Sequence, residues 1–326
     1  MIRTTIGKAD LTALVLILSV AVVIAYGYFT RVAKPNFEPR LELHSQIIKG
    51  TAPSPYRYRI LVPVIAEALR GALGIAMPTK AAFLLAYAIY DLIAISSLLV
   101  LLFYWLRTWF NSAQALVGVL FVAATMPVAL QDHYFQPWSL LEAALFTAAL
   151  LVIHGRRYLL LSIIVAVAAL NRETAILIPI AFLATLDVKG LLSSGPARDL
   201  RPILLFGGLC AIWAVGFFGL RELRGPAAGV EPVHDLFARN ITRANLLLAF
   251  RNGGMFLGGF WVFAALGLRC APAFIRRSVL LIPLYVAAIS VWGVWYEVRL
   301  LMPLYPLLIP LGLSFLYLRR RSTWAA

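Results

Sequence analysis

Isolated charged side chains interrupt several apolar stretches of this chain, and their types suit proton transfer and anion binding. Arg172 and Glu173 stand side by side in LNRETAIL, between two long apolar runs. Glu297 and Arg299 stand in a similar position in WYEVRLL. A carboxylate can remove a proton from a hydroxyl, and an arginine can hold a phosphate through two parallel hydrogen bonds. These residues therefore predict a site for a group that is carried on a phosphate or pyrophosphate.

The composition places these charges in a membrane protein. The 326 residues are 62% hydrophobic and 13% charged, whereas a soluble protein has about a quarter charged residues. We therefore expect a polytopic membrane protein. The net charge of +15 is scattered between apolar blocks and indicates membrane orientation, without a basic domain for nucleic acid. Cys210 and Cys270 are too few for a disulfide framework or a cysteine metal site.

The apolar blocks predict an all-α bundle of about 8–10 transmembrane helices in one domain, residues 1–326. A crossing helix needs about 20 apolar residues. Spans are predicted at 11–29, 81–106, 113–130, 138–154, 202–220, 253–268, 278–295 and 300–318. The block 158–187 is too long for one ordinary span, and its charged centre predicts a helical hairpin with its tip near one membrane surface. A single long tilted helix is the alternative.

Two long polar segments, 30–80 and 221–252, separate these spans and are predicted to be outer loops. The first contains RYRILVPVIAEALRGALGIAM, in which apolar and charged residues share one helix. Such a stretch predicts an interfacial helix after the first span. The first apolar block is long enough to span and lacks a clear cleavage site, so we interpret it as a signal anchor.

The short basic loops HGRRY, RCAPAFIRR and YLRRRS predict the orientation. The positive-inside rule is strongest in short loops, so we expect a multi-pass protein of the bacterial inner membrane with both termini in the cytoplasm. Asp132, the tip of the 158–187 hairpin and WYEVR then share the outer side. These charges predict an outward-facing cavity, because ionisable residues within spans usually face a bundle interior or water.

Each candidate also has a structural interpretation. Arg172 and Glu173 can simply form the polar turn of the hairpin, and Glu38 and Glu42 can be solvated loop acids. Asp91, deep in a span, is interpreted as a hydrogen-bonding partner. The histidines have no second histidine at ligand spacing, so we expect no metal site there.

Several stretches resemble those of the GT-C-fold integral-membrane glycosyltransferases, in particular uncharacterised bacterial members. They are FEPRLELHSQIIKG, PYRYRILVP, QDHYFQPWSLLEAAL, LNRETAIL and YEVRLLMPLYPLL, and in layout they cover most of the chain. In that family an acid follows the first span, ahead of an interfacial helix, and acts as the base. FEPRLELHSQIIKG occupies that place, but the loop lacks the family's usual Asp. Either Glu38 or Glu42 replaces it, or the activity has been lost or relocated.

The resemblance implies transfer of a sugar from a polyprenyl-phosphate carrier to a lipid or glycan acceptor on the periplasmic side. The implied general bases are Glu38 and Glu42, with Asp132 as a further candidate. The implied binders of the lipid phosphate are Arg57, Arg59, Arg172 and Arg299, with Glu173 and Glu297 orienting them. The partners are the bilayer and the lipid-linked donor. No cofactor motif is present, and a divalent metal is neither indicated nor excluded.

Three alternatives stay open. A transporter or lipid flippase would use the same charges as a substrate path, although only one helix is expected to be broken and no matching half is detected. A large outer loop with paired arginines would favour a polysaccharide polymerase or ligase, and the 221–252 segment is a modest version of such a loop. A non-catalytic assembly subunit is the third.

Overall fold

The computed structural model describes residues 7–131, 134–186, 200–226 and 233–322, and this part of the chain is all-helical, without strands. Seven of its helices are long and apolar enough to cross a membrane, or eight if one bent pair counts as a span. The expected all-α class with membrane-length helices is thus confirmed, at the lower end of the expected number.

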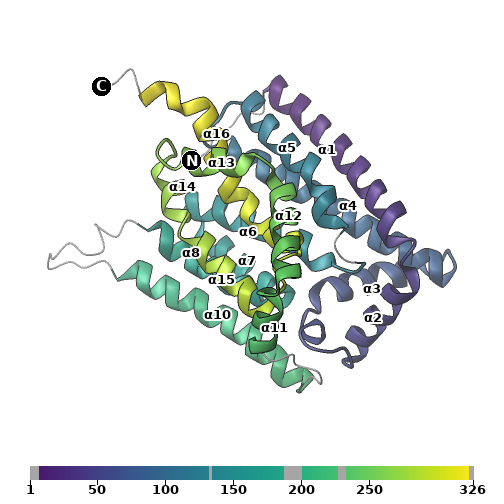
Figure 1. Ribbon diagram of the computed structural model, residues 1–326. Coiled ribbons are helices and arrows are strands. Elements are labelled where there is room, and N and C mark those ends of the chain that lie inside the picture. The colour runs from purple at the N-terminus through teal and green to yellow at the C-terminus, as the bar shows by residue number, and fades with distance from the viewer. Residues whose placement is uncertain (1–6, 132–133, 187–199, 227–232, 323–326) are drawn as a thin grey trace.

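The long helices enclose one apolar core (Figure 1). Helices α1 (Lys8–Tyr28), α4 (Thr79–Leu106) and α5 (Ser112–Leu130) pack side by side. Helix α6 (Pro137–His154) and the segment formed by η4 (Val298–Leu304) and α16 (Tyr305–Ser322) are the most buried spans. Helix α10 (Arg201–Arg224) runs along the edge, with only 11% of its apolar window buried. An apolar helix with so little of its surface covered by protein is compatible with a lipid-facing position.

The polar segment after the first span folds into helices beside the bundle. A short π-helix, η1 (Phe29–Ala33), extends α1, and α2 (Phe37–Lys49) follows. The 3-10 turn η2 (Tyr56–Tyr58) then leads to α3 (Leu61–Leu73), which buries Val62 and Ala66 and packs on α4. The amphipathic stretch expected as an interfacial helix therefore forms α3, with its apolar face on the bundle.

The block 158–187 reverses direction, as the hairpin hypothesis expects, over its described part to residue 186. Helix α7 (Tyr158–Asn171) ends at Arg172, which is extended at φ −155° and ψ 151°. The 3-10 turn η3 (Glu173–Ile176) and α8 (Leu177–Thr185) follow. The rings of Tyr158 and Phe182 lie 5.7 Å apart between centroids. The far ends of a single tilted helix could not meet in this way.

The expected span 253–268 is bent within the chain that the structure describes. It crosses the break between α12 (Arg243–Leu257) and α13 (Phe260–Gly267), whose axes differ by 75°. Gly258 has a positive φ of 53°, a conformation that glycine adopts without steric cost. The bend lets α13 lie close on α16, where a Cβ on Gly267 would stand 1.9 Å from the Leu311 carbonyl oxygen.

The connecting segments after α10 also form helices. The short helix α11 (Val233–Asn240) precedes α12, and α14 (Ala273–Ser278) leads into α15 (Leu281–Trp292). The expected outer loop 221–252 therefore consists largely of the end of α10, α11 and part of α12 where it is described. Helix α11 packs on α15 and brings its end to the residues that follow α15.

Candidate functional site

Contacts between distant segments divide the bundle into two ends. At one end Asp10, in the first turn of α1, accepts a 3.0 Å hydrogen bond from Arg107 Nε after α4. Trp109 and Phe274 both pack on the ring of His154 at the end of α6, with centroids 5.3 Å and 5.1 Å away. The start of α1 and the ends of α4 and α6 therefore lie together, as expected for segments predicted to face the same side of the membrane.

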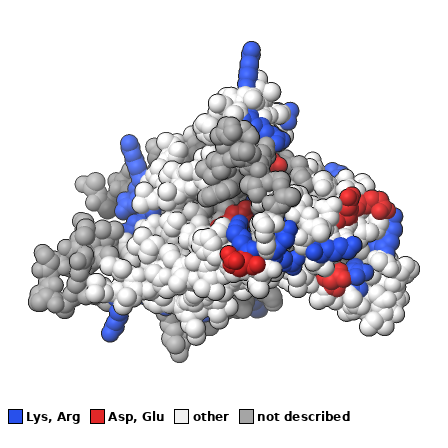
Figure 2. All heavy atoms as spheres, turned by 90° about the horizontal axis from the view of Figure 1, so that it is seen from below, with Lys and Arg blue, Asp and Glu red and all other residues white. Residues whose placement is uncertain are grey.

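The opposite end holds the charged hairpin tip and the basic last turn of α10. Asn171 Nδ2 donates to the Trp138 carbonyl at 3.1 Å, which joins the hairpin tip to the start of α6. Arg224, at the end of α10, donates to the Ile47 carbonyl in α2 at 2.8 Å. Seen from below the view of Figure 1, basic and acidic side chains gather on an otherwise mostly uncharged surface (Figure 2).

A cavity of about 340 Å³ opens among these segments. It is formed by the residues around η2, the hairpin tip, α11 and the segment between α15 and η4. Its charged lining residues are Arg59, Arg172, Glu173, Arg239, Glu297 and Arg299. Five of the six substrate-binding residues expected from sequence therefore line one cavity, although they come from three separate parts of the chain.

Arg59 and Glu173 join the η2 segment to the hairpin tip. Arg59 Nε lies 3.3 Å from Glu173 Oε2, and Arg59 Nη2 donates to Oε1 of the same carboxylate. The Arg59 carbonyl accepts a 2.8 Å hydrogen bond from Trp138 Nε1. Trp213 Nε1 donates to the Glu173 carbonyl at 3.3 Å. Both members of this pair are thus held at backbone and side chain, which fixes the guanidinium at the cavity wall.

Arg172 is held from behind by Glu142, a carboxylate on the buried helix α6. Arg172 Nη1 donates to Glu142 Oε2, while Thr174 Oγ1 and, at 3.2 Å, Tyr285 OH donate to Oε1. Glu142 was not among the residues expected to bind substrate. Its sequence signal was an acid inside an apolar helix, which requires a partner, but the sequence does not identify that partner.

The third wall brings in Arg239, an arginine of the 221–252 segment that was not among the expected phosphate binders. Arg299 Nη2 lies 2.5 Å from Glu297 Oε2. Arg239, at the end of α11, donates to Tyr296 OH at 3.3 Å. Its neighbour Asn240 bonds the Gly293 carbonyl at 3.0 Å, which fastens α11 to this segment. A solvated loop arginine has no local signal that would single it out.

The lining has an excess of positive charge. Four arginines face two glutamates among its described residues, and Glu142 behind Arg172 compensates one further charge. Such a surface suits an anion with several oxygens, because guanidinium forks match phosphate geometry. Among the described residues no group of three or more histidine, cysteine or acidic side chains is placed to hold a metal ion.

The remaining expected residues lie elsewhere. Arg57 does not line the cavity, and its Nη2 donates to the Arg224 carbonyl at the end of α10. Glu38 and Glu42 lie on the exposed side of α2, where Glu42 Oε1 accepts a 3.2 Å hydrogen bond from Gln46. Asp132 lies outside the described residues.

Tyr134, between α5 and α6, has Glu42 and Tyr56 among its electrostatic neighbours. Burial raises the pKa of the Tyr134 phenol, and the nearby Tyr56 and Glu42 side chains raise it further. Tyr56 itself lines the cavity. Neither Glu42 nor Tyr134 lines the cavity.

No family model matches this chain, and no curated protein or solved structure matches it either.

Proposed function

We propose that this protein is a membrane glycosyltransferase that moves a sugar from a polyprenyl-phosphate carrier to a lipid or glycan acceptor. The observation that carries the proposal is the arginine-lined cavity at one end of a bundle of membrane-length helices. A lipid-linked donor can enter such a cavity sideways from the bilayer, so no soluble nucleotide-binding domain is required. The GT-C resemblance of the sequence supports the same chemistry.

The donor phosphate would bind Arg59, Arg172, Arg239 and Arg299. In the reaction, the acceptor hydroxyl oxygen bonds to the anomeric carbon, and the bond from that carbon to the phosphate oxygen breaks. The carrier phosphate leaves with the electron pair, and fixed guanidinium groups stabilise the charge that it gains. Because Glu142 and Glu173 bind Arg172 and Arg59, these arginines need little rearrangement when the charge develops.

The hydroxyl proton must pass to a carboxylate, and the candidates remain Glu38, Glu42 and Asp132. Glu173 is a weaker base, because the bound Arg59 stabilises its ionised form, and one carboxylate oxygen of Glu297 is already bound to Arg299. Glu42 has only a neutral amide as its hydrogen-bond partner within the described chain.

A transfer assay tests the proposal. Purified protein in nanodiscs would be supplied with polyprenyl-phosphate-linked hexoses and pentoses, and release of the carrier phosphate would be measured. We expect Arg299→Lys to lower the rate roughly 100-fold, because lysine cannot reproduce a two-point contact. Arg243→Lys, at an exposed position outside the cavity, is the matched control. Full activity after alanine replacement of each of Glu38, Glu42 and Asp132 would rule out the proposed bases.

The orientation is a further part of the proposal, with the cavity on the periplasmic side and both termini in the cytoplasm. Single cysteines replacing Glu38 and Arg157, in a background with Cys210 and Cys270 changed to serine, would be treated in intact cells with an impermeant thiol reagent. Both positions are exposed and lie at opposite ends of the bundle. We expect labelling at 38 and none at 157, and the reverse pattern would place the cavity on the cytoplasmic side.

One observation favours the transporter alternative and another opposes it. A second helix break occurs between α12 and α13, beyond the break at Arg172. Both breaks follow α6, however, so they do not occupy corresponding positions in two halves of the chain. Paired breaks in matching halves are the pattern typical of secondary transporters.

A further inference from the structure

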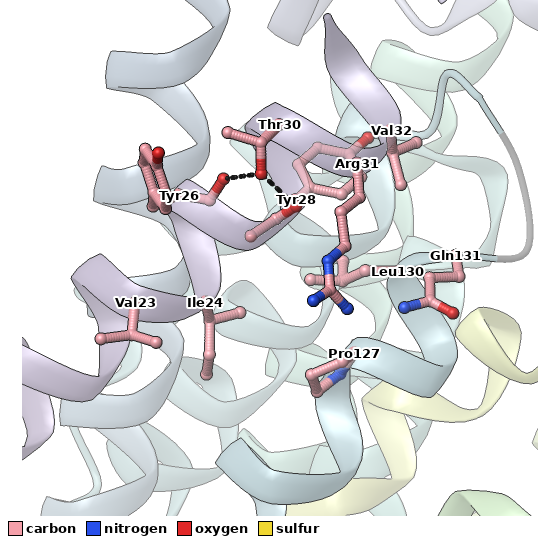
Figure 3. A pocket seen from close by; sticks show the side chains of 11 residues that line it. Val23, Ile24, Tyr26, Tyr28, Thr30, Arg31, Val32, Pro127, Leu130 and Gln131 are labelled. Carbon is pink, nitrogen blue, oxygen red and sulfur yellow. Dashed lines mark hydrogen bonds between the residues drawn. The ribbon is translucent and has the colours of Figure 1, made fainter. Parts of the chain in front are cut away.

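A second cavity, of about 350 Å³, lies on another side of the bundle, between α1 with its extension η1 and the end of α5 (Figure 3). It shares no lining residue with the arginine cavity. Its walls are mainly apolar and include Val23, Ile24 and Pro127. Thr30, Arg31 and Gln131 supply polar groups at its η1 end. We call it the α1–α5 groove.

The groove arises from local departures from regular helix on both sides. The π-helix η1 widens the backbone at the end of α1, a feature that is frequent at functional sites. Thr30 Oγ1 lies 2.9 Å from the Tyr26 carbonyl and 3.2 Å from the Gly27 carbonyl, so it satisfies groups at the distortion. Pro127 interrupts α5 opposite. At Gly27 a Cβ would meet nothing within 4 Å, so the space is open there.

Arg31 is the charged group of the groove. Figure 3 shows its side chain reaching from η1 towards α5, with the guanidinium between Ile24, Pro127 and Gln131. Within the described chain this guanidinium has no hydrogen bond or ion pair to another residue. A cation beside apolar walls at a membrane-spanning helix is costly unless an anion or water compensates it. The groove therefore combines an apolar slot with an unmatched positive charge at one end.

We propose that the α1–α5 groove binds one anionic phospholipid of the surrounding bilayer. The phosphate would contact Arg31 and Gln131, and one hydrocarbon chain would lie against Val23, Ile24 and Pro127. A lipid fits better than a free anion because most of the wall is apolar and because α1 is among the membrane-length helices. Val23 and Tyr26 are 70% and 69% exposed, so the groove opens where protein gives way to bilayer.

The groove wall is connected to the interior. Tyr28 lines the groove, and its hydroxyl accepts a 3.1 Å hydrogen bond from Arg40 Nη1. The same nitrogen donates to the Tyr134 carbonyl at 2.9 Å. A lipid packed on Tyr28 would thus stabilise the arginine that holds the segment after α5. The binding proposal does not depend on the proposed glycosyltransferase activity.

Native mass spectrometry of the detergent-solubilised protein tests the site, with phosphatidylglycerol as the anionic probe and phosphatidylcholine as the zwitterionic one. We expect one phosphatidylglycerol to bind more tightly than phosphatidylcholine. Arg31→Gln should weaken the binding of phosphatidylglycerol about tenfold, since one charge-assisted contact is lost. The binding of phosphatidylcholine should stay nearly unchanged. Lys34→Gln, an exposed basic position outside the groove, is the matched control and should change neither lipid.

A second variant tests the slot. Gly27→Leu fills the open space and should weaken the binding of both lipids, although Arg31 is intact. If Gly27→Leu lowers the melting temperature, the smaller Gly27→Ala and the Arg31→Gln result decide the matter. Equal phosphatidylglycerol affinity in wild type, Arg31→Gln and the Gly27 variants would overturn the proposal. Displacement of the lipid by millimolar inorganic phosphate would also overturn it, because it would indicate a simple anion site.

Discussion

Glu142 should be the residue whose loss does most harm to the hairpin tip. It is buried on α6 and accepts hydrogen bonds from Arg172, Thr174 and Tyr285. Glu142→Gln keeps the size of the side chain but removes its charge. Arg172, 7% exposed, would then be a buried cation without its counter-ion. We expect a loss of about 3–5 kcal/mol in the free energy of unfolding, as for other broken buried pairs.

The reverse change should be similarly harmful, and the two changes should not add. Arg172→Met leaves the Glu142 carboxylate with only the two neutral hydroxyl donors. The double variant Glu142→Gln/Arg172→Met removes both charges, so neither is left uncompensated. Its loss should therefore be smaller than the sum of the single losses by about 2 kcal/mol or more. This non-additivity is expected because the two charges are shielded from solvent as well as close to each other.

The measurement is a double-mutant cycle by equilibrium unfolding in one detergent. The matched control is Glu67 with Arg70 on α3, a pair 2.5 Å apart whose side chains are about a third exposed. Its coupling should stay below about 1 kcal/mol, because solvent screens exposed pairs. Additivity of the Glu142 and Arg172 losses within about 0.5 kcal/mol would refute the argument.

Three further predictions concern pH and packing. Burial lowers the pKa of His44, so on acidification the unfolded chain takes up a proton at this histidine before the folded chain does. The free energy of unfolding should therefore fall as the pH drops below about 6.5. In thermal melts recorded across this pH range, His44→Asn should abolish the fall. The hydrogen bonds from Arg70 and His44 together lower the pKa of Glu67 to about 2, so the stability that ionised Glu67 contributes above about pH 4.5 should be lost between pH 4.5 and pH 2. Gly267→Ala should cost about 1–3 kcal/mol or more because its Cβ would overlap a backbone carbonyl of α16. Gly219→Ala, with nothing within 4 Å, should be neutral or stabilising.

Local composition predicted the membrane-length helices, because a crossing segment must be apolar along its own length. It also predicted the break at Arg172, since charged neighbours interrupt the apolar run there. The bend at Gly258 had a local signal too, in the paired glycines of GGMFLGGF, but the run was long enough to suggest one span. The direction of the bend depends on α16, against which α13 packs.

The sequence by itself thus determined the class of the molecule, most of its helices and the residue types available for chemistry. Only the tertiary structure decided which charges meet. Arg59 and Glu173 are 114 positions apart, and Tyr285 reaches Glu142 across 143 positions. Arg57 has the same local signal as Arg59, yet it contacts the end of α10 and does not line the cavity. Apolar periodicity acts within one helix, whereas the partner of a buried charge is chosen by how separate helices pack.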